Sequence, residues 1–160
     1  MVADFVVDVN NSDDIVTARQ AGHELARQLG FSLTDVTMIA TAISEIARNI
    51  TSYAGRGEVS VGVQYRDGRQ ALVVRAEDDG PGIADVEHAL EDGYSTGRGL
   101  GLGLPGARRL MDRLVVDSAP GKGTVVEMWK WIPPDGSARL ARPDRVGGGR
   151  APTTRRGGVR

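Results

Sequence analysis

The sequence predicts an α+β fold, a two-layer sandwich with helices on one face of a mixed, mostly antiparallel sheet. Three observations support this prediction. Apolar residues recur three and four apart over residues 15–29 and again over 36–50, which is typical of two amphipathic helices. Alternating strands flank a hairpin turn at Asp67-Gly68. A second strand pair flanks Pro120-Gly121-Lys122-Gly123.

The first elements have clear boundary signals. A short strand is predicted over Asp4 to Val9. Asn11-Ser12-Asp13-Asp14 then supplies a helix cap and first-turn acids, and Gly30 ends that helix. Ser32-Leu33-Thr34-Asp35 resembles a capping box at the start of the second helix. The second helix is predicted to end at Gly55.

The remaining elements complete the sheet and add one helix. Strict alternation predicts a strand over residues 59–65, and Ala71 to Ala76 forms its returning partner. After a long glycine-rich stretch, Leu104 to Leu114 reads as a third helix. The strands Val115 to Ser118 and Thr124 to Trp131 then close the domain.

Composition limits the class of protein and its domain organisation. The 160 residues, 40% hydrophobic and 26% charged, suit one globular domain, which we place at residues 1–132. The formal net charge of -1 gives no whole-chain argument for nucleic acid or membrane binding. No cysteine is present, which excludes disulfides and thiolate chemistry.

Two further expectations concern location and the end of the chain. The start lacks a signal-peptide pattern and no run reaches the roughly 18 apolar residues of a membrane helix, so a cytoplasmic protein is expected. Residues 133–160 are rich in Pro, Gly and Arg, with seven arginines against two aspartates. They predict a disordered basic tail, and an arm that touches an acidic partner stays open as the alternative.

Glu45 and Asn49 form the first candidate site. They lie one helical turn apart, opposite the centre of the apolar stripe of their helix. An exposed Glu–Asn pair would give the same pattern. A carboxylate one turn from an amide oxygen also suits Mg²⁺ binding and the orientation of a hydroxyl group.

Asp78 is the second candidate. It shares a strand face with Leu72, Val74 and Ala76, so it is buried if that face is buried. A buried carboxylate needs hydrogen-bond donors, and the exocyclic amine of adenine is a suitable one. Gly80 and Gly82 follow in Asp78-Asp79-Gly80-Pro81-Gly82 and would let backbone approach a flat base. A tight turn accounts for the glycines but not for the acid.

The third candidate is the run Gly97-Arg98-Gly99-Leu100-Gly101-Leu102-Gly103, which leads directly into a helix. Glycines spaced by two at a helix start present free N–H groups and a positive dipole end to an anion. A flexible linker is the alternative, but linkers do not alternate Gly with Leu.

Other motif matches fail on context. Residues 101–106 match G-x-G-x-x-G, but residues 91–100 contain no strand, so a dinucleotide fold is not supported. Gly121-Lys122-Gly123-Thr124 lacks the upstream glycine of a P-loop. His23 has no following proline, unlike a sensor-kinase phosphoacceptor, and we interpret it as an ordinary helix residue. His88 is interpreted as a solvated side chain.

Taken together, these features follow the order of motifs in the GHKL (Bergerat) ATPase/kinase superfamily. Glu45-xxx-Asn49 resembles its N-box, and Asp78-x-Gly80-x-Gly82 resembles its G1 box. Gly99-Leu-Gly101-Leu-Gly103 is similar to the G2 box, and Lys122-Gly123-Thr124 to its final Gly-Thr element. Each motif alone is weak, but four in order on suitable elements are a strong signal.

The resemblance is closer to the bacterial RsbT-type serine/threonine kinases. It lies in residues 41–49 (TAISEIARN), 91–96 (EDGYST) and 103–112 (GLPGARRLMD), and covers essentially Phe5 to Trp131. The related RsbW and SpoIIAB anti-sigma kinases share the motifs but bind a sigma factor. The Ala-Arg-Asn and Leu-Pro-Gly-x-Arg-Arg stretches favour the RsbT type.

The resemblance implies a role for each motif residue. Asn49 would hold Mg²⁺, Glu45 would accept the proton of the incoming hydroxyl, and Asp78 with Thr124 would bind adenine. The related anti-sigma kinases have an arginine just ahead of their Gly-x-Gly, and the corresponding position here is Gly99. The adjacent Arg98 is the candidate cation for the γ-phosphate, and a solvated lid residue is the alternative. The nucleotide-binding set implied by the motifs is Asn49, Asp78, Gly80, Gly82, Gly99, Gly101, Gly103 and Thr124.

The resemblance also implies an activity and partners. An ATP- and Mg²⁺-dependent kinase of this type phosphorylates a STAS-domain antagonist in a bacterial stress-signalling pathway and regulates a partner phosphatase of the PP2C type. An anti-sigma factor with kinase activity is the main alternative. An ATP-dependent binding switch without transfer is the third, and Glu45 argues against it because a pure binder needs no base.

Overall fold

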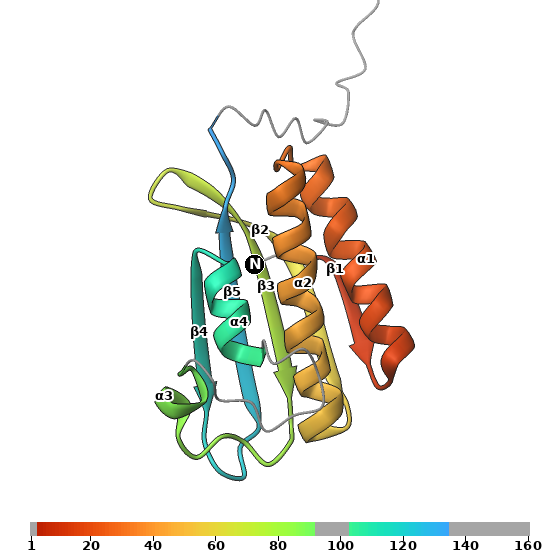
Figure 1. Ribbon diagram of the computed structural model, residues 1–160, viewed down its shortest axis with the longest axis vertical. Coiled ribbons are helices and arrows are strands. Elements are labelled where there is room, and N and C mark those ends of the chain that lie inside the picture. The colour runs from red at the N-terminus through yellow and green to blue at the C-terminus, as the bar shows by residue number, and fades with distance from the viewer. Residues whose placement is uncertain (1–2, 92–102, 135–160) are drawn as a thin grey trace, which may run out of the picture.

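The computed structural model describes residues 3–91 and 103–134 as one two-layer α+β unit (Figure 1). One layer is a five-stranded sheet in the order β1-β2-β3-β5-β4, and the other consists of helices on one face of it. The predicted fold class is confirmed. All four strand pairings are antiparallel, so the described sheet is antiparallel throughout rather than mixed. The strands are β1 (Ala3–Val9), β2 (Gly57–Arg66), β3 (Arg69–Asp78), β4 (Arg113–Ser118) and β5 (Thr124–Trp131).

The first two helices begin where the sequence signals predict. The Asn11 side chain accepts from the backbone N–H groups of Asp13 and Asp14, at 2.9 and 3.1 Å. The Ser32 Oγ accepts from the Asp35 N–H at 3.1 Å. These contacts satisfy amides that have no partner within the helix. The helical elements are α1 (Ser12–Gln28), α2 (Leu33–Asn49), a π-helical turn η1 (Ile50–Ala54), α3 (Val86–Ala89) and α4 (Gly103–Leu110).

The end of α2 differs from a regular helix. After Asn49 the chain widens into the π-helical turn η1, and Gly55 closes it by donating its N–H to the Ile50 carbonyl at 2.9 Å. Gly55 has φ +83°, which a glycine adopts without steric cost. Single π-helical turns often occur at functional sites. Here the turn brings Ala54 against the loop that follows β3.

Two expectations for the second half are corrected. The third helix ends at Leu110 rather than Leu114, and β4 begins at Arg113. The reason is strand pairing, because Asp112 donates its N–H to the Trp129 carbonyl at 2.9 Å and its carboxylate accepts from the Trp131 N–H at 2.7 Å. The short helix α3 was not predicted; Asp85 caps it by accepting from the His88 N–H.

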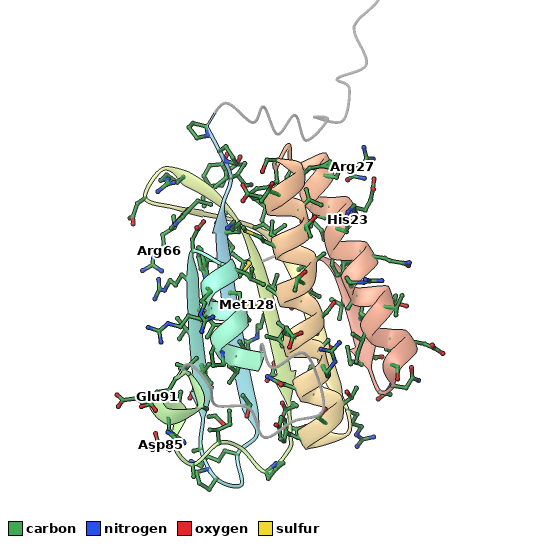
Figure 2. All side chains as sticks on the ribbon, viewed as in Figure 1. His23, Arg27, Arg66, Asp85, Glu91 and Met128 are labelled. Carbon is green, nitrogen blue, oxygen red and sulfur yellow. The ribbon has the colours of Figure 1, made fainter. Side chains whose placement is uncertain are left out.

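The core lies between the helices and the sheet, and α2 is its most buried helix. Helix α2 packs against α1 on one side and α4 on the other, so its buried residues extend well beyond one stripe. Gly22 of α1 allows the close contact with α2, because a Cβ atom there would lie 2.1 Å from Ile43 Cδ1. Met128 of β5 is fully buried where α4 covers the sheet (Figure 2).

The opposite sheet face has a small cluster of its own. Ala71 and Val73 are fully buried on that face, with Trp129 and Trp131 packed over them. Arg66 stacks on the Trp129 ring at 5.6 Å and Arg69 on the Trp131 ring at 4.6 Å. These arginines cover the cluster through cation–π contacts. Within the described ranges, none of the helices combines the length and apolar character that crossing a bilayer requires.

Candidate nucleotide-binding site

The predicted site residues come together at one end of the sandwich. The end of β3, the last turns of α2 and the start of α4 all face this end (Figure 1). Asp78 is the last residue of β3, paired in register with Gly57 of β2 and Thr124 of β5. Glu45 and Asn49 lie on α2, and Gly103 is the first residue of α4.

Glu45 is buried and makes contacts with both α2 and α4. Its side chain is 9% exposed, so the alternative of a solvent-exposed Glu–Asn pair is wrong for this residue. Its Oε1 accepts from Arg48 Nη1 at 2.9 Å, and its Oε2 accepts from the Gly103 N–H at 3.0 Å. A buried carboxylate requires such donors. The sequence did not indicate that Glu45 is buried, because the burial depends on α4, which packs against this side of α2.

Asn49 lies one turn beyond Glu45 and is half-buried. Its side-chain amide makes no hydrogen bond to residues 3–91 or 103–134. A half-buried amide at the edge of a site is therefore available to a ligand. An amide oxygen is a suitable ligand for Mg²⁺.

Asp78 lies on the predicted strand face, whose residues Leu72, Val74 and Ala76 are buried. Asp78 itself is half-buried rather than buried, because it ends the strand. Its Oδ1 accepts from the Gly80 N–H at 2.9 Å. Its Oδ2 has no partner in the described part of the chain, so one carboxylate oxygen with a fixed orientation is free to accept a hydrogen bond.

Glycines surround Asp78 where any side chain would collide with the backbone or with a neighbour. A Cβ atom on Gly57 would lie 2.5 Å from the Glu77 carbonyl oxygen, and one on Gly80 would lie 2.6 Å from the Ala54 Cβ. Gly82 has φ +77°, and a Cβ atom there would lie 2.0 Å from the Ala119 carbonyl oxygen. The glycines therefore allow the chain segments around Asp78 to pack without side chains between them.

Ser118 is a site residue that the sequence analysis missed. Its Oγ accepts from the Ile83 N–H at 2.8 Å, donates to the Gly123 carbonyl at 2.9 Å and lies 2.8 Å from Thr124 Oγ1. Because its single proton is used on Gly123, Thr124 must donate to Ser118. The lone pairs of Thr124 then remain as acceptors. The sequence feature that could have identified Ser118 is its place at the end of the predicted strand before the turn. The strand register places it opposite Thr124.

The β4–β5 turn gives a stability prediction. Gly123 has φ +71°, and a Cβ atom there would lie 2.0 Å from the Asp78 carbonyl oxygen. We expect Gly123→Ala to lower the free energy of unfolding by about 3 kcal/mol or more, because a steric clash adds to the cost of positive φ. Denaturant unfolding measures it.

Gly121→Ala is the matched control for that variant. Gly121 has φ +77° in the same turn, but nothing lies within 4 Å of its added Cβ. Gly121→Ala should lower the free energy of unfolding by only about 1 kcal/mol, which is the cost of the positive φ alone. Equal losses in the two variants would contradict the proposed collision with the end of β3.

Some predicted residues lie outside the described part of the chain. Arg98, Gly99 and Gly101 fall in residues 92–102, and the predicted basic tail, residues 133–160, lies outside the described residues from 135 onward. His23 and His88 are exposed, as expected for ordinary surface residues. Figure 2 shows His23 on the outer side of α1, far from the end of β3.

The fold and site define an ATP-binding domain, and comparison with known proteins agrees. The family model described as "Histidine kinase-like ATPase domain" matches residues 9–130, and the chain belongs to this family. The serine/threonine-protein kinase RsbT of Bacillus subtilis (strain 168) is 49% identical over 119 residues, which cover 74% of this chain and 90% of RsbT. The predicted resemblance to RsbT-type kinases and the predicted class of enzyme are confirmed.

Anti-sigma F factors are more distant relatives. The factor of Caldanaerobacter subterraneus subsp. tengcongensis is 33% identical over 121 residues, covering 72% of this chain and 83% of the factor. That of Pasteuria penetrans is 35% identical over 128 residues, covering 74% and 83%. Among solved structures, the mycobacterial sensor histidine kinase MprB is similar with TM-score 0.49 and 19% identity, covering 79% of this chain and 96% of that one.

Proposed function

We propose that the protein transfers the γ-phosphoryl group of ATP to a serine or threonine of a STAS-domain antagonist, with Mg²⁺ as cofactor. The observation that carries this proposal is the buried carboxylate of Glu45, one turn from Asn49 and joined to the start of α4. A protein that only binds ATP has no need of a base at this position. The similarity to RsbT supports the same activity.

The end of β3 would bind the adenine. Two acceptors lie on neighbouring strands there, the Oδ2 of Asp78 and the Oγ1 of Thr124. The exocyclic amine of adenine carries two protons and suits a site lined by acceptors. Guanine has a carbonyl oxygen at the same position, so two acceptors would reject it. We therefore propose selectivity for ATP over GTP.

Glu45 would act at the other end as general base. The hydroxyl oxygen of the substrate forms a bond to the γ-phosphorus while the bond from that phosphorus to the bridging oxygen breaks. The electron pair of the broken bond stays on the departing ADP, and the hydroxyl proton moves to a Glu45 carboxylate oxygen. The N–H groups at the start of α4 and the positive end of its dipole would stabilise the phosphates. Arg98 remains our proposed cation for the γ-phosphate.

Asn49 would hold Mg²⁺, which neutralises phosphate charge when bound. The described residues contain no group of three His, Cys, Asp or Glu side chains that could bind a metal ion on their own. Phosphate oxygens and water molecules would therefore have to supply the other ligands. We expect calorimetry to detect no Mg²⁺ binding at millimolar concentration without ATP, and clear binding with it. Tight binding of Mg²⁺ to the nucleotide-free protein would contradict this assignment.

The relatives suggest two kinds of partner. Similarity to RsbT favours a STAS-domain substrate and a PP2C-type phosphatase as the regulated partner in a stress-signalling pathway. Similarity to the anti-sigma F factors supports a second candidate function, in which the protein binds a sigma factor and its kinase activity releases it. The higher identity to RsbT, 49% against 33% and 35%, favours the first.

One experiment separates these functions. The purified protein is incubated with Mg²⁺ and γ-labelled ATP, together with a STAS-domain protein or a sigma factor from the same organism. We expect label on a serine or threonine of the STAS protein. A stable complex with the sigma factor and no need for the STAS protein would favour the anti-sigma function. Bound ATP without any transfer would refute the kinase and favour a binding switch.

A further inference from the structure

Both oxygens of Glu45 are occupied, and their two donors differ in kind. Arg48 follows Glu45 by three positions on the same helix, and its Nη1 lies 2.9 Å from Oε1. Gly103 belongs to another helix, and its backbone N–H lies 3.0 Å from Oε2. Each carboxylate oxygen has a second lone pair, so Glu45 can still accept a proton while both donors are bound, provided that its side chain is held in place.

Gly103 is the donor with a competing task. It is the last glycine of the run expected to bind phosphate, and it begins α4. One N–H makes one good hydrogen bond, so it cannot serve both a phosphate oxygen and Glu45 at full strength. Phosphate binding would draw this amide away from Oε2. Glu45 would then be left with an unoccupied oxygen and a single fixed partner.

We propose that Arg48 is a positioning residue for phosphoryl transfer, which holds Glu45 in place when the Gly103 amide turns to the phosphates. This inference rests on the proposed kinase function. The geometry suits the role, because the Arg48 side chain is 39% exposed while that of Glu45 is 9% exposed. Arg48 therefore reaches the buried carboxylate from the rim and compensates its charge without occupying the interior.

The simpler alternative is an ordinary helix-surface ion pair, which contributes about 0.5 kcal/mol of stability and nothing to transfer. The chain offers a matched control for it on α1. Arg27 contacts Glu24 at 2.8 Å with the same spacing of three residues, and both side chains are at least half exposed. The hydrogen bond from Arg27 lowers the pKa of Glu24 to about 2, and this pair lies outside the site.

The test compares Arg48→Gln, Arg48→Lys and the control Arg27→Gln in transfer assays with the STAS-domain substrate. We expect Arg48→Gln to lower kcat by at least about tenfold with ATP affinity within about threefold, because loss of positioning affects the reacting geometry. Arg48→Lys should keep kcat within about fivefold of that of the unmodified protein. The ammonium group of a lysine at position 48 still reaches Glu45, which lies three residues earlier on the same helix. Arg27→Gln should leave kcat unchanged.

Three outcomes would overturn the inference. The first is a folded Arg48→Gln variant with unchanged kcat, and the second is an equal loss in Arg48→Gln and Arg27→Gln. If Arg48→Gln does not fold, the Arg48→Lys variant provides the test. A decrease in the kcat of Arg48→Lys by more than about fivefold, at unchanged ATP affinity, is then the third outcome that contradicts the role. If the unmodified protein transfers no phosphate, the proposed function fails and the inference with it, whereas transfer unaffected by Arg48→Gln refutes the inference alone.

Discussion

Asp78→Asn is expected to weaken ATP binding by about 100-fold or more, roughly 3 kcal/mol, while the protein remains folded. The Gly80 N–H donates to Asp78 Oδ1, which fixes the orientation of the replacement amide. The Asn oxygen would keep that contact, and its NH₂ group would take the place of Oδ2. The NH₂ group of the asparagine and the exocyclic amine of adenine, both hydrogen-bond donors, would then face each other. Isothermal titration with ATP measures the loss.

Asp79→Asn is the matched control, because Asp79 is adjacent in the chain but exposed. Its ATP affinity should stay within about threefold, as for surface substitutions away from a site. A titration with GTP adds a second comparison, and the unmodified protein should bind GTP far more weakly than ATP. Affinity of Asp78→Asn within threefold of the unmodified protein would mean that adenine does not bind at this carboxylate.

Glu45→Gln is expected to reduce phosphoryl transfer by about 10²- to 10⁴-fold, the range for loss of a general base. ATP affinity should remain within about threefold, since Glu45 is assigned to the hydroxyl and not to the nucleotide. The substitution also removes one acceptor from between the two donors on Arg48 and Gly103, so a moderate loss of stability is expected. Single-turnover transfer at saturating ATP gives the rate.

The comparison variant for this prediction is Glu24→Gln, which removes an exposed carboxylate that is also paired with an arginine. It should transfer phosphate at the rate of the unmodified protein. Transfer by Glu45→Gln at more than about a third of the normal rate would exclude Glu45 as the base. Loss of ATP affinity in parallel with transfer would instead indicate a binding role for this residue.

The elements that sequence could predict are those set by local chemistry. Asn11 and Ser32 cap their helices through contacts two and three residues away, so their patterns are readable in the chain. The turn at Asp67-Gly68 has positive φ at both residues, as an Asp-Gly hairpin requires. The resemblance assigned Asp78 and Thr124 to one adenine site, and the register places these two residues opposite each other on β3 and β5.

What sequence could not predict depends on packing between distant segments. The burial of Glu45 arises because α4, nearly sixty residues later, packs against α2. Leu110 ends its helix because Asp112 pairs with β5, which overrides local helix propensity. The role of Ser118 depends on three partners, two of which lie five or six residues away and one 35 residues away. Such contacts leave no periodic signal.

The central claim is transfer of one phosphoryl group to a protein hydroxyl, and mass spectrometry of the STAS-domain partner tests it most directly. The partner is analysed after a single turnover with Mg²⁺, ATP and the unmodified protein. We predict one phosphate on one serine or threonine of the partner, and none when Glu45→Gln is used. An unmodified partner in the presence of bound ATP, or phosphate found instead on His23 of this chain, would contradict the account.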